Sequence, residues 1–235
     1  SASMANATTD DALVARFLLV RHGESKVMVE GVVGGPKTCS GLSDRGRDQA
    51  ERLGSRFAAG SENSIEIAYS SPLPRALETT EIVLSSASLN LEINIHPSLE
   101  EFKLGEADGL TWEEVRTRYD LGNFEQRDPF TPIIPGADSR AGFRHRVAEA
   151  LSEIADLHHG STIFIGCHGG VISAAMATAF GLGVNQWHTE LAPVVTSITE
   201  LEILSSPVRG RRWMCRRYND SVHLHGTDVD PRDHL

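Results

Sequence analysis

The sequence predicts an α/β fold with a largely parallel sheet. Strand-like apolar runs alternate with helix-like segments along most of the 235 residues, which is the pattern of a parallel sheet covered by helices. Two of the runs, "RFLLV" at 16–20 and "TIFIG" at 162–166, are dominated by apolar residues, as expected for strands buried on both faces. No internal repeat or low-complexity linker divides the chain, so we expect a single domain.

The elements of the first half follow from local signals. After the strand at 16–20, the glycine-rich stretch "EGVVGGPKTCSG" predicts a loop, and Ser43 is placed to cap the helix that follows. The segment "SIEIAYS" predicts the second strand. Ser71 and Pro72 then supply an N-cap and a first-turn proline for the next helix.

The second half continues the alternation. The segment "LEINIHP" alternates like a strand, and "SLEEFKLGEADGLTWEEV" predicts a loop followed by a helix. The remaining expected elements are a helix at 141–158, a strand at 162–166, a helix at 171–180 and strands at 194–204 and 211–219.

Composition excludes several classes of function. The formal net charge of -10 argues against non-specific binding to nucleic acid or to an anionic membrane, which needs a basic face. No apolar run approaches membrane-spanning length. The three cysteines are widely spaced and show no zinc-ligand or disulfide pattern. We therefore expect a cytoplasmic protein whose partner is a small molecule, which can be anionic if cations gather locally; a homodimer stays open.

Three segments are expected to lie outside the regular core. We expect residues 1–14 to be a disordered N-terminal segment, with a tag remnant ahead of Met4, and 226–235 to be a flexible tail. The irregular stretch 120–139 is long enough to form a cap over a site, or it is a mobile surface insertion. Its apolar side chains could contact a substrate or anchor the loop to the domain; they are Phe124, Phe130, Ile133 and Ile134.

Chemically active residues follow the predicted strands. Open α/β sheets bind ligands at the carboxyl ends of their strands. The residues found there are Arg21 and His22 after the first strand, Arg75 after the second, Glu100 and Glu101 after the strand at 91–95, and His168 after the strand at 162–166. Two arginines, two histidines and an acid should therefore converge at one edge of the sheet.

This set of side chains suits a phosphoryl group. Arginine guanidinium groups match phosphate oxygens in bidentate geometry. A helix opening at Gly169 and Gly170 would add backbone N–H groups and the positive end of its dipole. A histidine can accept the phosphoryl group covalently, and a carboxylic acid can protonate the departing oxygen. The pattern thus indicates phosphomonoester chemistry.

Four segments together resemble one known family. "LLVRHGES", "SSPLPRALETTEIV", "SLEEFKLGEADGLT" and "GCHGGVI", in this order, resemble the histidine phosphatase superfamily, which has the phosphoglycerate mutase-like fold. The similarity runs from about 16 to 224 and ends with "YNDSVHL". It implies a three-layer α/β/α sandwich with a mostly parallel central sheet, and a histidine phosphatase domain over 15–225.

The resemblance also implies roles for single residues. His22 would be the nucleophile that becomes phosphohistidine, and Arg21 and Arg75 would bind the phosphoryl oxygens. His168 would donate to the phosphoryl group, and Glu101 would be the general acid, with Glu100 the weaker candidate. The family mechanism needs no metal and no cofactor.

Residues beyond this set receive weaker assignments. We expect Ser25, Gly169 and Lys37 to contact the substrate, whereas Met28 stands where family members often have asparagine.

The choice of reaction rests on the segments around the acid and the second histidine. "EEFKLG" and "HGG" resemble the phosphatase branches of the family more than the mutases. A phosphoglycerate mutase would need further cations around its substrate, for which Lys26, Lys37 and Arg140 are candidates. The expected function is therefore metal-independent hydrolysis of a small phosphorylated metabolite. A mutase, or a phospholigand-binding module without turnover, is the alternative.

Overall fold

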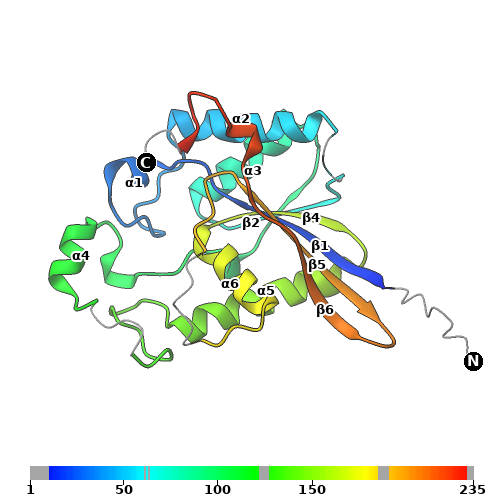
Figure 1. The fold of residues 1–235 in the computed structure, drawn as a ribbon. Helices are drawn as coiled ribbons and strands as arrows, with labels where there is room; N and C mark the ends of the chain where they lie inside the picture. Colours follow the sequence, from blue (N-terminus) through cyan, green and yellow to red (C-terminus); the bar gives the residue numbers. More distant parts are fainter. Residues whose placement is uncertain (1–10, 61, 63, 122–126, 185–190, 232–235) are drawn as a thin grey trace, which may run out of the picture.

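A six-stranded sheet forms the centre of the protein (Figure 1). The computed structural model describes residues 11–60, 62, 64–121, 127–184 and 191–231. The strand order is β3-β2-β4-β1-β5-β6. The strands are β1 (Ala12–Arg21), β2 (Ile67–Ser70), β3 (Ile93–Ile95), β4 (Thr162–Cys167), β5 (Ile198–Ser206) and β6 (Gly210–Asp220). The first four strands in this order are parallel, whereas β5 runs antiparallel to β1 and to β6. The predicted mostly parallel α/β fold is confirmed.

Helices cover both faces of the sheet (Figure 1). They are α1 (Lys26–Glu30), α2 (Asp44–Ala58), α3 (Pro74–Ser86), α4 (Trp112–Arg118), α5 (Arg140–Leu157) and α6 (Gly169–Ala179). Short 3-10 turns span Pro97–Leu99, Gly105–Ala107 and Val222–Leu224. In β1, Phe17 and Leu19 pack into the core with α5 and α6, and Leu18 and Val20 pack into the core with α2 and α3. The protein is therefore a three-layer α/β/α sandwich.

The register of the central strands brings their carboxyl ends together. Arg21 at the end of β1 pairs with Cys167 at the end of β4, and Ser70 at the end of β2 pairs with Gly166. The residues that follow these three strands therefore start from neighbouring points on one edge of the sheet, as parallel topology requires.

The two helix starts that the sequence predicts differ in outcome. Ser43 caps α2 as expected, because its hydroxyl accepts a hydrogen bond from Gly46 N (3.0 Å). Helix α3 begins at Pro74 with Leu73 as N-cap, so the prediction that Ser71 caps it was wrong. The Ser71 hydroxyl instead accepts from Leu73 N (3.3 Å) and lies 2.7 Å from Nε2 of His168.

Parts of both expected terminal segments belong to the folded domain. Strand β1 begins at Ala12, so 12–14 belong to the sheet rather than to a disordered segment. At the other end, Val229 and Asp230 are buried, because Gln49 on α2 donates to the Val229 carbonyl (3.0 Å) and Arg45 donates to the Asp230 carbonyl (2.9 Å). Residues 226–231 thus pack against α2 and are not a flexible tail; 1–10 and 232–235 lie outside the described residues.

The described part of the 120–139 loop is anchored to the domain. Ile134 is buried in a small apolar cluster with Val33, Ala107 and Val115, and Ile133 packs against this cluster. Phe130 is 70% exposed. Ile133 and Ile134 therefore anchor the loop to the domain. Phe124 lies outside the described residues.

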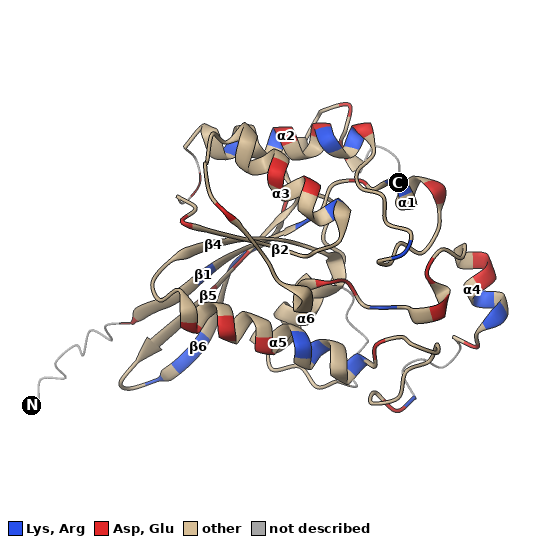
Figure 2. Cartoon of the chain, turned by 180° about the vertical axis from the view of Figure 1, so that it is seen from behind, with Lys and Arg blue, Asp and Glu red and all other residues tan. Residues whose placement is uncertain are grey.

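Charged residues of both signs are interspersed along α2, α4 and α5 (Figure 2). None of the helices in the described part of the chain is both long and apolar enough to cross a membrane.

Helix α2 packs directly on the loop that follows β1, and a glycine permits the contact. A Cβ at Gly46 would overlap the carbonyl oxygen of Glu24, while Ser43 N donates to the same carbonyl (2.9 Å). Only glycine allows the first turn of α2 to approach this loop so closely.

We expect Gly46→Ala to destabilise the protein. Alanine favours a helix interior by about 1 kcal/mol over glycine, but the overlap with backbone must be relieved by moving α2 or the loop, so the net change in the free energy of unfolding should be a loss of about 1–3 kcal/mol. Urea unfolding measures it. The control is Ser55→Ala, at an exposed position of the same helix, which should stay within about 0.5 kcal/mol of the parent. A Gly46→Ala protein as stable as the control would contradict the packing argument.

Candidate active site

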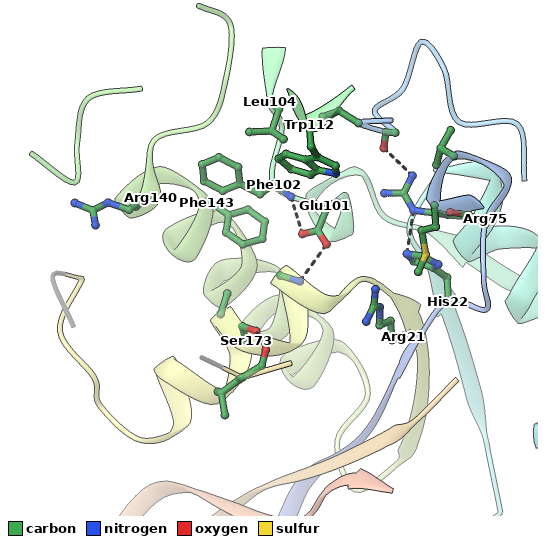
Figure 3. A pocket seen from close by; sticks show the side chains of 18 of the residues that line it. Arg21, His22, Arg75, Glu101, Phe102, Leu104, Trp112, Arg140, Phe143 and Ser173 are labelled. Atoms are coloured by element: carbon green, nitrogen blue, oxygen red, sulfur yellow. Dashed lines mark hydrogen bonds between the residues drawn. The ribbon is translucent and has the colours of Figure 1, made fainter. Parts of the chain in front are cut away.

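The predicted catalytic residues surround the end of a cavity of about 930 Å³ (Figure 3). Arg21 and His22 follow β1, Arg75 lies in the first turn of α3, and Glu101 follows the 3-10 turn after β3; all four line the cavity. His168, which follows β4, lies next to His22, and the two ring centroids are 5.2 Å apart. The fold therefore brings together the five residues that the sequence places at strand ends.

The hydrogen bonds of His22 fix its tautomer. Nδ1 lies 2.7 Å from the carbonyl oxygen of Gly23, which can only accept, so Nδ1 carries the proton. Nε2 accepts a hydrogen bond from Nε of Arg75 (3.0 Å) and thus holds the lone pair. Burial, and then the charges of Arg75 and Arg21, lower the pKa of His22 well below its ordinary value. The imidazole is therefore neutral and presents Nε2 as a nucleophile.

Two guanidinium groups, one buried and one partly buried, flank this nitrogen. Arg75 is almost fully buried and also donates from Nη1 to the Gly34 carbonyl (2.8 Å). Arg21 donates from Nη1 to the Pro193 carbonyl (2.6 Å), while its Nε is buried and has no hydrogen-bond partner among the described residues. Buried donors without a partner are rare. The position of the Arg21 and Arg75 guanidinium groups beside His22 suits the oxygens of a bound phosphoryl group.

His168 is also neutral. It is fully buried, its Nε2 lies 2.7 Å from the Ser71 hydroxyl, and its Nδ1 has no partner in the described part of the chain. Burial, and then the charge of Arg75, lower the pKa of His168 well below its ordinary value. The imidazole can thus exchange one hydrogen bond, with Ser71 or with a ligand, without becoming charged.

The carboxylate of Glu101 is oriented by two backbone N–H groups. It accepts from Phe102 N (2.8 Å) and from Gly170 N in the first turn of α6 (3.1 Å). A Cβ at Gly170 would overlap this carboxylate, so a larger residue there would displace the Glu101 side chain. The neighbouring Glu100 pairs with Lys103 (3.2 Å) and does not line the cavity. Of the two candidates, Glu101 is the acid that faces the site.

The three residues expected to contact substrate differ in position. Ser25 lines the cavity, and its buried hydroxyl has no hydrogen-bond partner among the residues described. Gly169 opens α6 next to Arg21. Lys37 is exposed and lines a separate hollow of about 300 Å³. The structure therefore does not bring Lys37 to this cavity, because its backbone N–H donates to Asp108 (2.8 Å) and holds the loop elsewhere.

Of the cations that a mutase would require, some line the cavity and others do not. Lys26 is exposed and does not line the cavity, whereas Arg140 lines it, together with Arg144 from the same helix. The sequence analysis missed Arg144, because nothing in the local pattern of α5 distinguishes it from the other basic residues of that helix.

Sequence reasoning also missed Arg146, which holds the loop that carries the acid. Its Nη1 donates to the carbonyls of Ser98 (2.9 Å) and Glu100 (3.0 Å), and its Nη2 pairs with Asp138 (2.6 Å). Backbone carbonyls leave no trace in a sequence, so no pattern could have indicated this contact.

Other reactive groups are absent from the described residues of the site. No cluster of three or more histidine, cysteine, aspartate and glutamate side chains there is arranged to hold a metal ion. Cys167 is fully buried in the core, and burial raises the pKa of its thiol, so the thiol is a packing group rather than a nucleophile.

Comparisons with known proteins agree with this geometry. The model of the histidine phosphatase superfamily (branch 1) matches residues 17–221. Phosphoglycerate mutase-like protein 4 of Arabidopsis thaliana is 33% identical over 166 residues, which are 70% of each chain. A metal-independent phosphoserine phosphatase of the same plant is 27% identical over 215 residues, 90% of this chain and 84% of that protein.

Among solved structures, YhfR of Bacillus stearothermophilus superposes with a TM-score of 0.76 at 28% identity, over 89% of this chain and 99% of the other. The family match spans almost all of the three-layer domain and includes every residue of the site described above. The chain belongs to the histidine phosphatase superfamily, branch 1.

Proposed function

We propose that the protein hydrolyses phosphomonoesters through a phosphohistidine formed on Nε2 of His22. One observation carries the proposal: the Gly23 carbonyl holds the proton on Nδ1, so that a neutral Nε2 lies among Arg21, Arg75 and His168. The family match and the metal-independent phosphatase among the relatives support the reaction. A cytoplasmic location and a homodimer stay predictions.

In the first step, Nε2 of His22 attacks phosphorus as the bond to the ester oxygen breaks. Arg75 gives up its hydrogen bond to Nε2 and, with Arg21, binds the phosphoryl oxygens. His168 and the buried hydroxyl of Ser25 donate to the same oxygens. Glu101 transfers its proton to the departing alkoxide, which leaves as an alcohol.

In the second step, a water molecule attacks phosphorus and the bond to Nε2 breaks. The Glu101 carboxylate takes one proton from this water, so inorganic phosphate leaves and the acid is restored. The proton on Nδ1 of His22 stays in its hydrogen bond to Gly23 throughout. No step needs a metal, because the guanidinium groups neutralise the charge that develops on the phosphoryl oxygens.

The mutase alternative finds less support. Three relatives carry mutase names, and Arg140 and Arg144 line the cavity, but neither Lys26 nor Lys37 does. A mutase must hold the substrate carboxylate with cations next to the phosphoryl pocket. Isomerisation of 3-phosphoglycerate, assayed beside phosphate release, separates the two reactions.

Replacing the nucleophile should abolish turnover. We expect His22→Ala to lower kcat for 4-nitrophenyl phosphate by at least about 10³-fold, while the parent keeps its activity in the presence of a chelator. Rapid quenching of the parent should trap a protein-bound phosphate that is labile in acid and stable in base. Chelator-sensitive activity, or full activity of the variant, would contradict the mechanism.

Replacing the acid should affect poor leaving groups most. For an alkyl phosphate, Glu101→Gln should lower kcat/KM, which reports the first step alone, by about 10²–10⁴-fold, because the alkoxide then leaves without a proton. For 4-nitrophenyl phosphate, whose leaving group is a stable anion, the loss should be much smaller. The matched control is Glu100→Gln, which should behave like the parent on both esters. Equal losses in the two variants would remove Glu101 from the acid role.

Stability should fall as the pH drops below about 6.5. The pKa values of His22 and His168 are lowered in the folded protein, so below the unfolded value near 6.5 the unfolded chain binds more protons. Each histidine then removes up to about 1.4 kcal/mol per pH unit from the free energy of unfolding. In urea unfolding between pH 5.5 and 7, His168→Gln should show a shallower slope than the parent. Identical slopes would show that His168 is protonated in the fold.

A further inference from the structure

The cavity extends well beyond the phosphoryl pocket, between α1, α4, α5 and α6. In Figure 3, Phe102 and Phe143 lie side by side next to Glu101, with Leu104 and Trp112 on the same wall. The two phenyl rings pack edge to face, with centroids 5.3 Å apart. The whole cavity has a volume of about 930 Å³, which is about six times the ~150 Å³ that holds a benzene molecule. A small hydrophilic body would leave most of this space unfilled.

The polar side chains of this extension are few, and each donates a hydrogen bond to a backbone carbonyl. Outside the phosphoryl pocket, the polar side chains among the described lining residues are Arg140, Arg144 and Ser173. Ser173 donates its hydroxyl to the Gly169 or Leu191 carbonyl (2.9 and 2.8 Å), Arg144 donates to the Leu182 carbonyl (2.6 Å), and Arg140 donates to the Arg127 carbonyl (2.5 Å).

Hydrogen-bond acceptors for a hydrophilic ligand are therefore scarce in this extension. Glu101 is the only carboxylate among the described lining residues, so the ammonium group of phosphoserine would have to compete for the general acid. The hydroxyl groups of a sugar or polyol would face apolar walls, and each one left without a partner costs about 1–3 kcal/mol.

Two apolar side chains on the cavity wall remain open to solvent. Met28 on α1 is 43% exposed and Trp112 on α4 is 46% exposed, and both line the cavity. A ligand that covers them removes apolar surface from water at about 25 cal/mol per Å². A hydrophilic ligand gains nothing comparable from these contacts.

We propose that the natural substrate is a phosphomonoester whose leaving group has an extended apolar body, at least the size of one ring. The phosphoryl group occupies the pocket of His22, and the apolar body lies along Phe102, Phe143 and Trp112. This inference rests on the phosphatase function proposed above. It sets the protein apart from enzymes that act on phosphoserine or phosphoglycerate.

A series of n-alkyl phosphates tests the inference, because chain length changes the apolar contact while leaving the reactivity of the ester nearly constant. From ethyl through butyl to hexyl phosphate, kcat/KM should rise by up to about fourfold for each added methylene. Glycerol phosphate and phosphoserine should fall below butyl phosphate. A flat series, or a preference for phosphoserine over hexyl phosphate, overturns the inference.

Variants show whether the cavity wall is responsible. Trp112→Ala should lower the ratio of kcat/KM for hexyl over ethyl phosphate by about tenfold, and Met28→Ala should lower it less. The matched control is Leu157→Ala, at the end of α5, where an apolar side chain is 65% exposed and does not line the cavity; it should keep the parent ratio. An unchanged ratio in both cavity variants overturns the placement of the apolar body.

The same assays separate the two proposals. Phosphate release that depends on His22 but not on chain length overturns the substrate inference and leaves the phosphatase function intact. A folded protein that releases phosphate from no ester overturns both.

Discussion

The hydrogen bond from Arg75 to Nε2 of His22 sets the chemical state of the site. A guanidinium group is charged at any working pH, so this donor keeps a second proton off the imidazole and leaves the lone pair in place. Arg75 and Arg21 are largely buried, and buried positive charge is costly unless an anion offsets it. The site is therefore poised for a doubly charged phosphoryl group, which would relieve the same electrostatic cost that keeps the histidines neutral.

The fold places these residues at the ends of paired strands and at the start of one helix. His22 and His168 directly follow paired strands, β1 and β4, and Gly170, two residues after His168, binds the Glu101 carboxylate. His168 and Gly170, whose N–H binds Glu101, are therefore separated by one residue at the start of α6. Because the sheet and the helix start are both packed in the core, His22 and Glu101 keep a fixed relation to each other.

Sequence patterns predicted the parts of the site that depend on strand ends. His22, Arg75 and His168 follow apolar runs or helix starts that can be recognised locally. Ser71 was predicted to cap α3, because its neighbours look like a helix start; its contact with His168 spans 97 positions in the chain. The positions of Lys37 and Val229 were equally beyond local patterns.

The positions of Lys37 and Val229 are both set by a partner that is distant in the sequence. The backbone N–H of Lys37 is held by Asp108, and the carbonyl of Val229 is held by Gln49 on α2. Polar residues near a terminus or in a glycine-rich loop resemble flexible chain until such a partner is known. The apolar extension of the cavity is likewise assembled from four helices and the loops between them, and no single stretch of sequence encodes it.

Asp138 has a consequence for how this enzyme could diversify. Its carboxylate accepts from Lys103 N (3.0 Å) and pairs with Arg146 (2.6 Å), its own N–H donates to the Lys103 carbonyl (2.9 Å), and Leu104 bridges to Ala137. The end of the 120–139 loop is thus fastened to the segment that follows Glu101. Insertions and deletions upstream of this fastening can accumulate without displacing Glu101, whereas loss of Asp138 would transmit changes in the loop to the Glu101 carboxylate. New substrate ranges can therefore evolve by exchange of the loop, provided that Asp138 and the pairing of Ala137 with Leu104 are kept.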